Sequence, residues 1–182
     1  FKFLGHMVSA DGLRQDPAKT RAVKDMPVGT SKELKSFLGF CSYYRKFVRD
    51  FSAIAWPLTD MLREIDKKSK KALVWSEERL AAVEALKTAM TTAPVLAHPD
   101  WSKPFILSTD ACKRSVAGVL EQKQDDGTER VIAYASRGLT DGERKYAIWE
   151  LEFLAVLWSC NHFRMYLALP FTDEFELRTD NR

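Results

Sequence analysis

The sequence has no long hydrophobic run and no export signal. Its longest uninterrupted apolar stretch is Phe153–Trp158, whereas a helix that crosses a membrane needs about 20 apolar residues. The N-terminus also lacks the order of basic, apolar and small residues that marks a secretory signal peptide. We therefore expect a soluble intracellular protein that is not secreted and has no membrane partner.

Cysteine and histidine are scarce. The three cysteines, Cys41, Cys112 and Cys160, form no C-x-x-C pair and are odd in number. This argues against a disulfide framework or a zinc knuckle and favours a reducing compartment. The three histidines are scattered without the spacing of metal ligands, so we expect them to be ordinary surface or partly buried residues.

Internal repeats and low-complexity segments are absent as well, and the composition is that of a globular protein. The chain has 182 residues, of which 46% are hydrophobic and 29% charged, so it can form a core in one or two domains. Residues 1–99 carry 17 Lys and Arg against 11 Asp and Glu, whereas residues 100–182 carry 11 against 14. This asymmetry indicates a polyanion partner for the first part and a cation site in the second. Chance surface composition is the alternative explanation.

The first part of the chain predicts a short strand followed by helices. Proline near the start of a segment, serine or threonine as a cap, and apolar residues spaced three and four apart indicate where the helices begin and which face they bury. The expected elements are a strand at 1–8, a turn at 10–13, helices from 17, from 30 to 48, from 52 to 62 and from 76 to the residues before 94, a polar loop at 66–71 and a linker at 94–104.

The second part of the chain changes to strands. Short apolar runs end at turn residues, and an apolar helix separates the third strand from the fourth. That helix is apolar on most faces, which predicts that it is packed in a core. Because a helix joins them, the last strand is expected to lie parallel to an earlier one. The expected elements are strands at 105–109, 115–120, 130–135 and 175–179 and a helix from about 147 to 167.

Three acidic residues stand in positions that need an explanation. Asp110 and Asp180 each follow an apolar strand, and Glu152 lies near the start of the apolar helix. Parallel strands bring their carboxyl ends to one edge of a sheet, where ligand sites of α/β proteins form. Converging carboxylates repel one another unless a divalent cation binds them. Each acid also has a plain structural explanation: an Asx turn at Asp110, a solvent-facing Glu152 and a cap at Asp180.

A series of short motifs covers nearly the whole chain. In order, they are Phe3-Leu4-Gly5-His6, Gly12, Asp16-Pro17, Lys19, Glu33-Leu34-Lys35-Ser36-Phe37-Leu38-Gly39, Tyr43-Tyr44-Arg45-Lys46-Phe47, Phe51-Ser52, Ile54-Ala55, Pro57-Leu58, Ala93-Pro94-Val95-Leu96, Pro99-Asp100, Lys103-Pro104-Phe105, Thr109-Asp110-Ala111, Ala133-Tyr134-Ala135-Ser136, Glu152 with Leu154-Ala155-Val156, His162-Phe163-Arg164 and Leu177-Arg178-Thr179-Asp180. In this order they resemble the reverse transcriptase of gypsy-type LTR retrotransposons, which is part of a Pol polyprotein.

The resemblance implies a fold and a division into domains. Residues 1–92 would be the end of the reverse transcriptase palm, the thumb and the connecting helices, and residues 93–182 the N-terminal part of an RNase H-like domain. The expected fold class is α+β or α/β, a small helical thumb region followed by an RNase H-like mixed sheet with the element order β-β-β-α-β. The family's polymerase motif, Tyr-x-Asp-Asp, is expected before Phe1, and a fourth RNase H aspartate after Arg182.

The resemblance also implies an active site. The family's catalytic, metal-binding carboxylates fall on Asp110, Glu152 and Asp180. Glu152 matches better than Glu150 because the family glutamate directly precedes an apolar pair and alanine. Two Mg²⁺ ions, or Mn²⁺, would bind these carboxylates and the scissile phosphate of the RNA strand in an RNA–DNA hybrid. The alternative is a non-catalytic RNase H-like connection module that binds nucleic acid.

The expected partners follow from the same resemblance. They are an RNA–DNA hybrid, primer–template nucleic acid, and the rest of the Pol polyprotein: palm and fingers, the remaining RNase H domain and integrase. The expected location is a cytoplasmic virus-like particle or the nucleus. The helix at 30–48 has four cationic side chains on the side opposite its apolar stripe, and these would contact the phosphates of the duplex. The alternative is that they only form a solvent-exposed face. These cations are Lys32, Lys35, Arg45 and Lys46.

Overall fold

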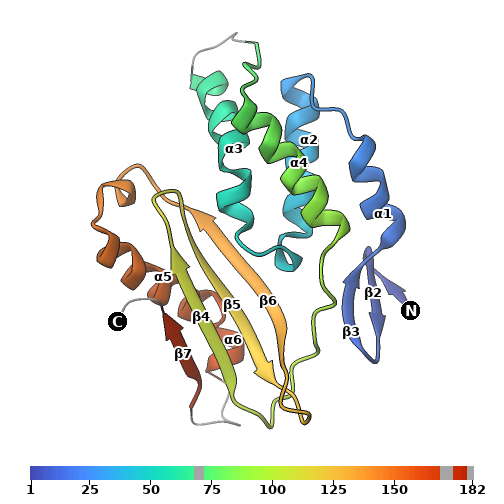
Figure 1. Ribbon diagram of the computed structural model, residues 1–182, viewed down its shortest axis with the longest axis vertical. Coiled ribbons are helices and arrows are strands. Elements are labelled where there is room, and N and C mark those ends of the chain that lie inside the picture. Colours follow the sequence, from blue (N-terminus) through green and yellow to red (C-terminus); the bar gives the residue numbers. More distant parts are fainter. Residues whose placement is uncertain (68–71, 169–173, 180–182) are drawn as a thin grey trace.

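The computed structural model describes residues 1–67, 72–168 and 174–179 (Figure 1). Helices α1–α4 form one group, and α5, α6 and the sheet of strands β4–β7 form a second group beside it (Figure 1). The described helices include none that is long and apolar enough to cross a membrane. The helices are α1 (Pro17–Ala22), α2 (Ser31–Tyr43), α3 (Phe51–Lys67), α4 (Glu77–Thr91), α5 (Ile148–His162) and α6 (Arg164–Leu167), and the strands are β1 (Lys2–Phe3), β2 (His6–Ser9), β3 (Gly12–Gln15), β4 (Phe105–Ala111), β5 (Ser115–Lys123), β6 (Glu129–Gly138) and β7 (Glu176–Thr179).

Helix α2 begins where the sequence predicts and ends earlier. The Thr30 hydroxyl accepts a hydrogen bond from Glu33 N at 3.2 Å, and the Glu33 carboxylate accepts one from Thr30 N at 2.9 Å. This capping box satisfies two amides that the first turn leaves free. The helix ends at Tyr43, and the 3₁₀ helix η2 (Arg45–Phe47) follows. The prediction of one helix to Val48 was wrong. Tyr44, Phe47 and Val48 are buried in the same core as the apolar face of α2, but they lie in and around η2 and not in the helix.

Helices α2, α3 and α4 enclose the first core. Phe37 of α2, Leu58 of α3 and Leu86 of α4 are completely buried there. Helix α3 starts one residue before the predicted position and continues to Lys67, beyond the predicted end at residue 62. The prediction was too short because Ile65, in the additional turn, still packs against this core.

The N-terminal segment folds into a small antiparallel sheet in the order β1-β2-β3. The strand expected at 1–8 is interrupted at Leu4 and Gly5, which both have positive φ, so the chain turns back there. Strand β3 then approaches the segment before the second group: Leu13 and Leu96 exchange two backbone hydrogen bonds of 2.8 Å.

The larger sheet has the strand order β6-β5-β4-β7. Strand β5 is antiparallel to both β4 and β6, whereas β7 pairs with β4 in parallel, with Ile106 opposite Glu176 and Thr109 opposite Thr179. The element order β-β-β-α-β and the parallel last strand are therefore confirmed. A parallel neighbour is possible because α5 and α6 carry the chain back along the sheet before β7 starts.

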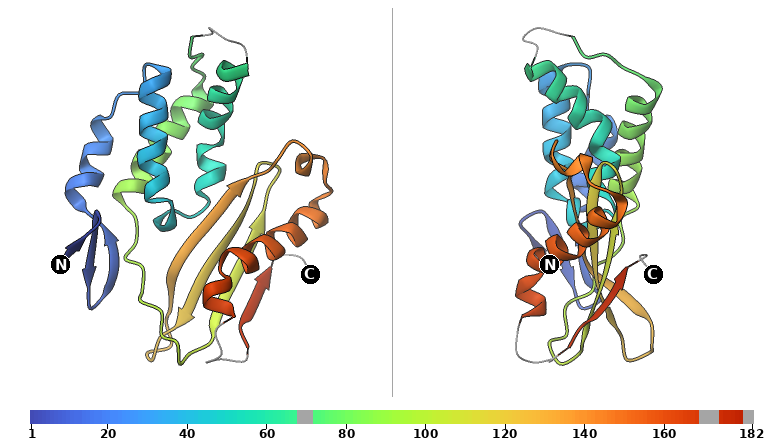
Figure 2. Two further views of the ribbon diagram at one scale, coloured as in Figure 1. Left: turned by 180° about the vertical axis from the view of Figure 1, so that it is seen from behind. Right: turned by 90° about the vertical axis from the view of Figure 1, so that its left-hand side faces the viewer.

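Helix α5 packs across one face of this sheet (Figure 2). The helix comes very close to β5 at Gly118, where an added Cβ would lie 2.5 Å from the Ser159 hydroxyl. The helix predicted at 147–167 divides at Phe163 into α5 and α6.

The prediction that α5 is packed in a core holds for one of its faces only. One face of α5 packs on the sheet of β4 and β5. The opposite face is also apolar, and no described residue covers it. Trp149, Phe153 and Leu157 are 63%, 63% and 54% exposed.

The buried cores divide near residue 96. The first core extends from Val23 to Leu96, and the others lie between Ala97 and Phe163. The segment expected as a linker at 94–104 contains no helix or extended strand, yet Ala97 N donates to Val131 O of β6 at 2.8 Å. The domain boundary between residues 92 and 93 stays a prediction.

Candidate active site and nucleic-acid surface

Asp110 lies near the carboxyl end of β4, on the sheet face that points away from α5. The next residue, Ala111, packs against a buried cluster that contains Leu151 and Ala155 of α5, and side chains alternate between the two faces along a strand. Asp110 is exposed, and its carboxylate has no hydrogen-bond or ion-pair partner among the described residues. No described helix crosses this face in front of β4 (Figure 1), so a solute can reach the carboxylate from solvent.

Asp110 lines a pocket of about 300 Å³ beside the helical group. Arg49 and Asp50, from the turn before α3, and Arg178 of β7 contribute to the same lining. Burial raises the pKa of Asp50, the positive charge of Arg49 opposes this, and the negative charge of Asp110 adds to it. Arg178 is neutralised, since its guanidinium binds both carboxylate oxygens of Glu129 at 2.7 and 2.8 Å. The pocket therefore combines an accessible carboxylate with a second, half-buried one.

Glu152 comes from the second turn of α5. It is half-buried, its Oε2 atom is shielded from solvent, and its neighbours Leu151 and Ala155 are completely or almost completely buried. The plain alternative of a solvent-facing Glu152 therefore does not describe this residue. Glu150 has a different task, because its carboxylate accepts a 2.7 Å hydrogen bond from Ala147 N and caps the helix.

Asp180 lies outside the described residues. The described ladder ends at the Thr109–Thr179 pair, which directly precedes Asp110 on β4 and Asp180 in the sequence. Within residues 1–67, 72–168 and 174–179, no group of three or more His, Cys, Asp or Glu side chains is arranged to hold a metal ion. The structure thus places the strands that precede both aspartates side by side and leaves the complete carboxylate set a prediction.

The four cations expected at the nucleic-acid surface divide into two pairs. Lys32 and Lys35 lie on the exposed side of α2. Arg45 and Lys46 are half-buried in η2, and burial lowers the pKa of both side chains. A single basic helix face therefore does not exist, because the chain leaves the helix before Arg45.

Arg45 connects the helical group to the sheet. Its guanidinium donates to the Ser136 carbonyl oxygen of β6 and to the Ser52 hydroxyl at 3.3 Å, and it lies 5.4 Å from the centre of the Phe51 ring. The Ser136 hydroxyl accepts a further hydrogen bond from Ser52 N at 2.9 Å. These contacts explain the burial of Arg45 by a structural role.

Sequence reasoning missed the companions of Asp110 in its pocket. Asp50 is separated from Asp110 by 60 positions and adopts a left-handed conformation with φ 53°, which aspartate tolerates better than most residues. No spacing rule connects it to β4. The acidic residue after a basic run is the only sequence signal, and it is too common to be diagnostic.

These features can be compared with known proteins. Residues 75–177 match the family described as the RNase H-like domain found in reverse transcriptase. The chain belongs to this family. The match starts before the predicted domain boundary, includes α4, and continues through β4, β5, β6 and α5 into the first half of β7.

The similar proteins confirm the resemblance to gypsy-type elements. The chain is 43% identical over 173 residues to the retrovirus-related Pol polyprotein from transposon opus of Drosophila melanogaster, covering 91% of the chain and 17% of that protein. It is 37% identical to the corresponding polyprotein from transposon gypsy of the same organism, covering 91% of the chain and 16% of that protein. The chain therefore spans about a sixth of the length of these relatives.

A solved structure shares the fold. The foamy viral protease-reverse transcriptase in complex with an RNA/DNA hybrid superimposes with a TM-score of 0.78 at 22% sequence identity, over 98% of this chain and 23% of that one. The RNase H-like fold class is thus established for the chain. Because 98% of the chain is superimposed, the helical group aligns with that structure as well as the sheet does.

Proposed function

We propose that this chain is part of the reverse transcriptase/RNase H of a gypsy-type retrotransposon and supplies three carboxylates for cleavage of the RNA strand in an RNA–DNA hybrid. The observation that carries the proposal is the parallel pairing of β4 with β7, which aligns the strand ends that precede Asp110 and Asp180. Glu152 is the third carboxylate. It comes from α5, on the other face of the sheet from Asp110, so the three carboxylates would meet at the edge where β4 and β7 end.

The residues present fit a divalent cation. Asp110 offers an accessible carboxylate without a protein partner among the described residues, and hard cations prefer such oxygen ligands. Asp110, Glu152 and Asp180 would hold two Mg²⁺ ions. When bound, such ions lower the pKa of a coordinated water and stabilise charge on the leaving oxygen.

The chain's own residues bind and orient the substrate. Lys32 and Lys35 are exposed on one helix and would contact backbone phosphates, which positions a duplex without reading its sequence. The open face of the sheet at Asp110 would receive the RNA strand, whose 2′-hydroxyl distinguishes it from DNA. The cleavage would take place inside the cell, in a virus-like particle or in the nucleus. The palm, fingers, remaining RNase H domain and integrase of the polyprotein would be its partners there.

The cleavage activity can be tested in a longer Pol chain that contains residues 1–182 and continues through the RNase H domain. We expect it to cut the RNA strand of a labelled hybrid in Mg²⁺ or Mn²⁺, to leave the DNA strand intact and to stop when EDTA is added. Residues 1–182 alone should cleave little, because the resemblance places a fourth aspartate after Arg182. Cleavage that persists in EDTA, or a longer chain inactive with both metals, would contradict the proposal.

Exchange of Lys32 and Lys35 for glutamine should weaken binding to a hybrid. Each phosphate contact contributes roughly 0.9 to the slope of log affinity against log salt concentration, so the double variant should lose about 2 from the slope. Titrations of a fluorescent hybrid between 50 and 200 mM salt, roughly the range in which phosphate contacts are revealed, measure it. Lys19→Gln/Lys24→Gln, with the same change in net charge, is the control, and an equal slope in both variants would disprove contact through α2.

A second candidate function is a non-catalytic connection module that holds nucleic acid. It is favoured by the position of Asp110 on the sheet face that points away from α5, the helix that carries Glu152. Such a module needs the cations and not Asp110, so it predicts normal hybrid binding and no dependence of the polyprotein's RNA cleavage on this carboxylate.

A further inference from the structure

A pocket of about 470 Å³ lies where the helical group meets the edge strand β6 and helix α5. We call it the seam pocket. It is distinct from the pocket at Asp110, with which it shares no lining residue. Its walls come from α2, η2, β6 and α5, so it exists only because both groups of elements pack together. It is lined by Ser42, Tyr43, Arg45, Lys46, Tyr134, Ala135, Ser136, Arg137, Trp158 and His162.

The seam pocket has a positive lining without a carboxylate. Four of its residues are Arg, Lys or His, and none is Asp or Glu. Two of the cations are already engaged: Arg45 binds the Ser136 carbonyl oxygen, and Arg137 binds Glu143 through two hydrogen bonds of 2.8 Å. The second pair is strong enough to lower the pKa of Glu143 to about 2.

Lys46 is the cation that remains available. It is half-buried, it has no ion-pair partner among the described residues, and its ammonium lies 5.4 Å from the centre of the Phe47 ring. Burial lowers its pKa, and burial together with the charge of Arg45 lowers the pKa of His162. A half-buried charge without a counterion is unfavourable, and an anion that enters the pocket would relieve this.

Aromatic rings complete the lining. The rings of Trp158 and His162 are in contact, with centres 5.1 Å apart. The Arg137 guanidinium lies over the Trp158 ring, 5.9 Å from its centre. Tyr43 of α2 and Tyr134 of β6 add two further rings to the lining. Cations combined with flat aromatic surfaces are the lining that binds single nucleic-acid strands, since phosphates meet the cations and bases stack on the rings.

We propose that the seam pocket binds one nucleotide unit of a single nucleic-acid strand, with its phosphate at Lys46 and His162 and its base against the aromatic rings. The volume suits a ligand larger than a free phosphate. A duplex would keep its bases stacked inside, so the rings favour an unpaired strand. The inference rests on the proposed function for the presence of nucleic acid and adds a second, single-strand site built from both parts of the chain.

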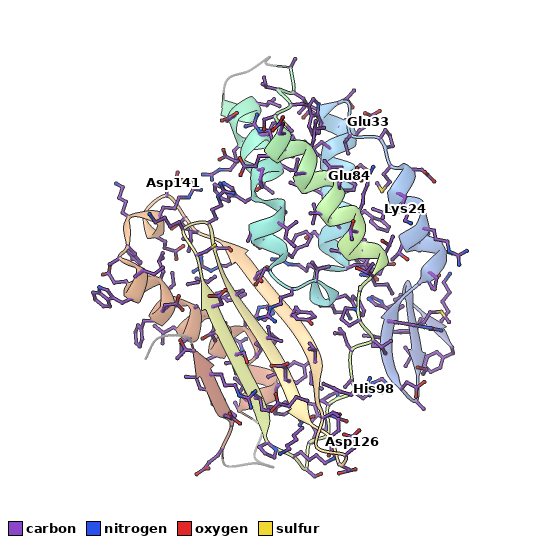
Figure 3. The ribbon with its side chains drawn as sticks, viewed as in Figure 1. Lys24, Glu33, Glu84, His98, Asp126 and Asp141 are labelled. Carbon is purple, nitrogen blue, oxygen red and sulfur yellow. The ribbon has the colours of Figure 1, made fainter. Side chains whose placement is uncertain are left out.

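The test uses the 182-residue chain and a fluorescent oligothymidylate, with an RNA–DNA hybrid as the second probe. Lys46→Gln should weaken oligothymidylate binding about tenfold, the cost of losing one charge-assisted hydrogen bond, and should change hybrid binding less than twofold. An abasic strand of the same length should bind the wild type at least about fivefold more weakly, because stacking is lost. Lys24→Gln is the charge-matched control, on the α1 side of the helical group away from the sheet (Figure 3).

A second readout separates binding from folding. Titration of the His162 ring by NMR, assigned with His162→Gln, should show a higher pKa when oligothymidylate is bound, because a phosphate joins Arg45, Lys46, Arg137, Tyr43 and Tyr134 around it. Equal losses in Lys46→Gln and Lys24→Gln, equal affinity for the abasic strand, or an unchanged His162 pKa would each overturn the seam pocket. Deoxythymidine monophosphate should displace the strand, because it carries the same phosphate and base, and failure to displace it would also overturn the proposal. Failure of the wild type to bind the hybrid would instead contradict the proposed function.

Discussion

Asp110→Asn and Glu152→Gln are each expected to lower the rate of RNA cleavage in a hybrid by about three orders of magnitude. Both substitutions keep the shape of the side chain and remove the negative charge that a divalent cation requires. Effects of this size are usual when a group that acts directly on the reaction is removed. The measurement is single-turnover cleavage of a labelled hybrid by the longer Pol chain in Mg²⁺, compared with the wild type.

The matched control is Glu150→Gln, two residues away on the same helix. Glu150 caps α5 by accepting the hydrogen bond from Ala147 N, and the glutamine carbonyl can still accept it, so cleavage should fall less than twofold. Hybrid binding in EDTA should be the same in all four proteins, which shows that the variants fold. Full cleavage by Asp110→Asn would exclude the carboxylate site and favour the connection module. If Glu150→Gln lost activity and Glu152→Gln did not, the choice between the two glutamates would be wrong.

Gly118→Ala is expected to reduce the free energy of unfolding by about 2 kcal/mol, because inserting atoms into a closely packed contact forces the backbone apart. The added Cβ would lie 2.5 Å from Ser159 Oγ, 2.9 Å from Ser159 Cβ and 3.3 Å from Phe163 Cε2. Ser159 is completely buried, so its hydroxyl cannot rotate into solvent, and α5 has to move away from β5. Urea unfolding at equilibrium measures the loss.

Gly39→Ala provides the control for this prediction. Gly39 lies within α2, and an added Cβ there meets nothing within 4 Å, so alanine should stabilise the chain by up to about 1 kcal/mol. In Gly118→Ala/Ser159→Ala the closest contact is removed, and part of the lost stability should return. Equal stability of Gly118→Ala and Gly39→Ala would mean that α5 does not pack on β5 as closely as the structure shows.

Several parts of the fold could be predicted because the responsible interactions are local. The capping box at Thr30 and Glu33 is a short-range hydrogen-bond pattern, and both residues are three positions apart in the sequence. The strands that became β4, β5 and β6 are apolar runs that end at turn residues. Their order with α5 and β7 follows from the rule that a helical connection returns the chain in parallel.

The tertiary structure alone decided how these elements are used. Tyr44 and Phe47 continue the apolar spacing of α2 and are buried, but they reach the core from a turn, because burial depends on position in space and not on helix geometry. The exposed stripe at Trp149, Phe153 and Leu157 has the same origin: composition reports how apolar α5 is, and only the packing shows that one face meets the sheet.

For the candidate sites, the sequence by itself determined the family resemblance and the carboxylates to test, because motifs are strings of neighbouring residues. It also predicted the strand that precedes Asp110 and the strand that precedes Asp180 in the sequence. Only the tertiary structure brought Asp50 to the pocket of Asp110, engaged Arg45 in a contact with β6, and placed Lys46 in one pocket with Trp158 and His162. The physical reason is that electrostatic and stacking interactions act over a few ångströms in space, whereas these partners are separated in sequence by 60 to 116 positions.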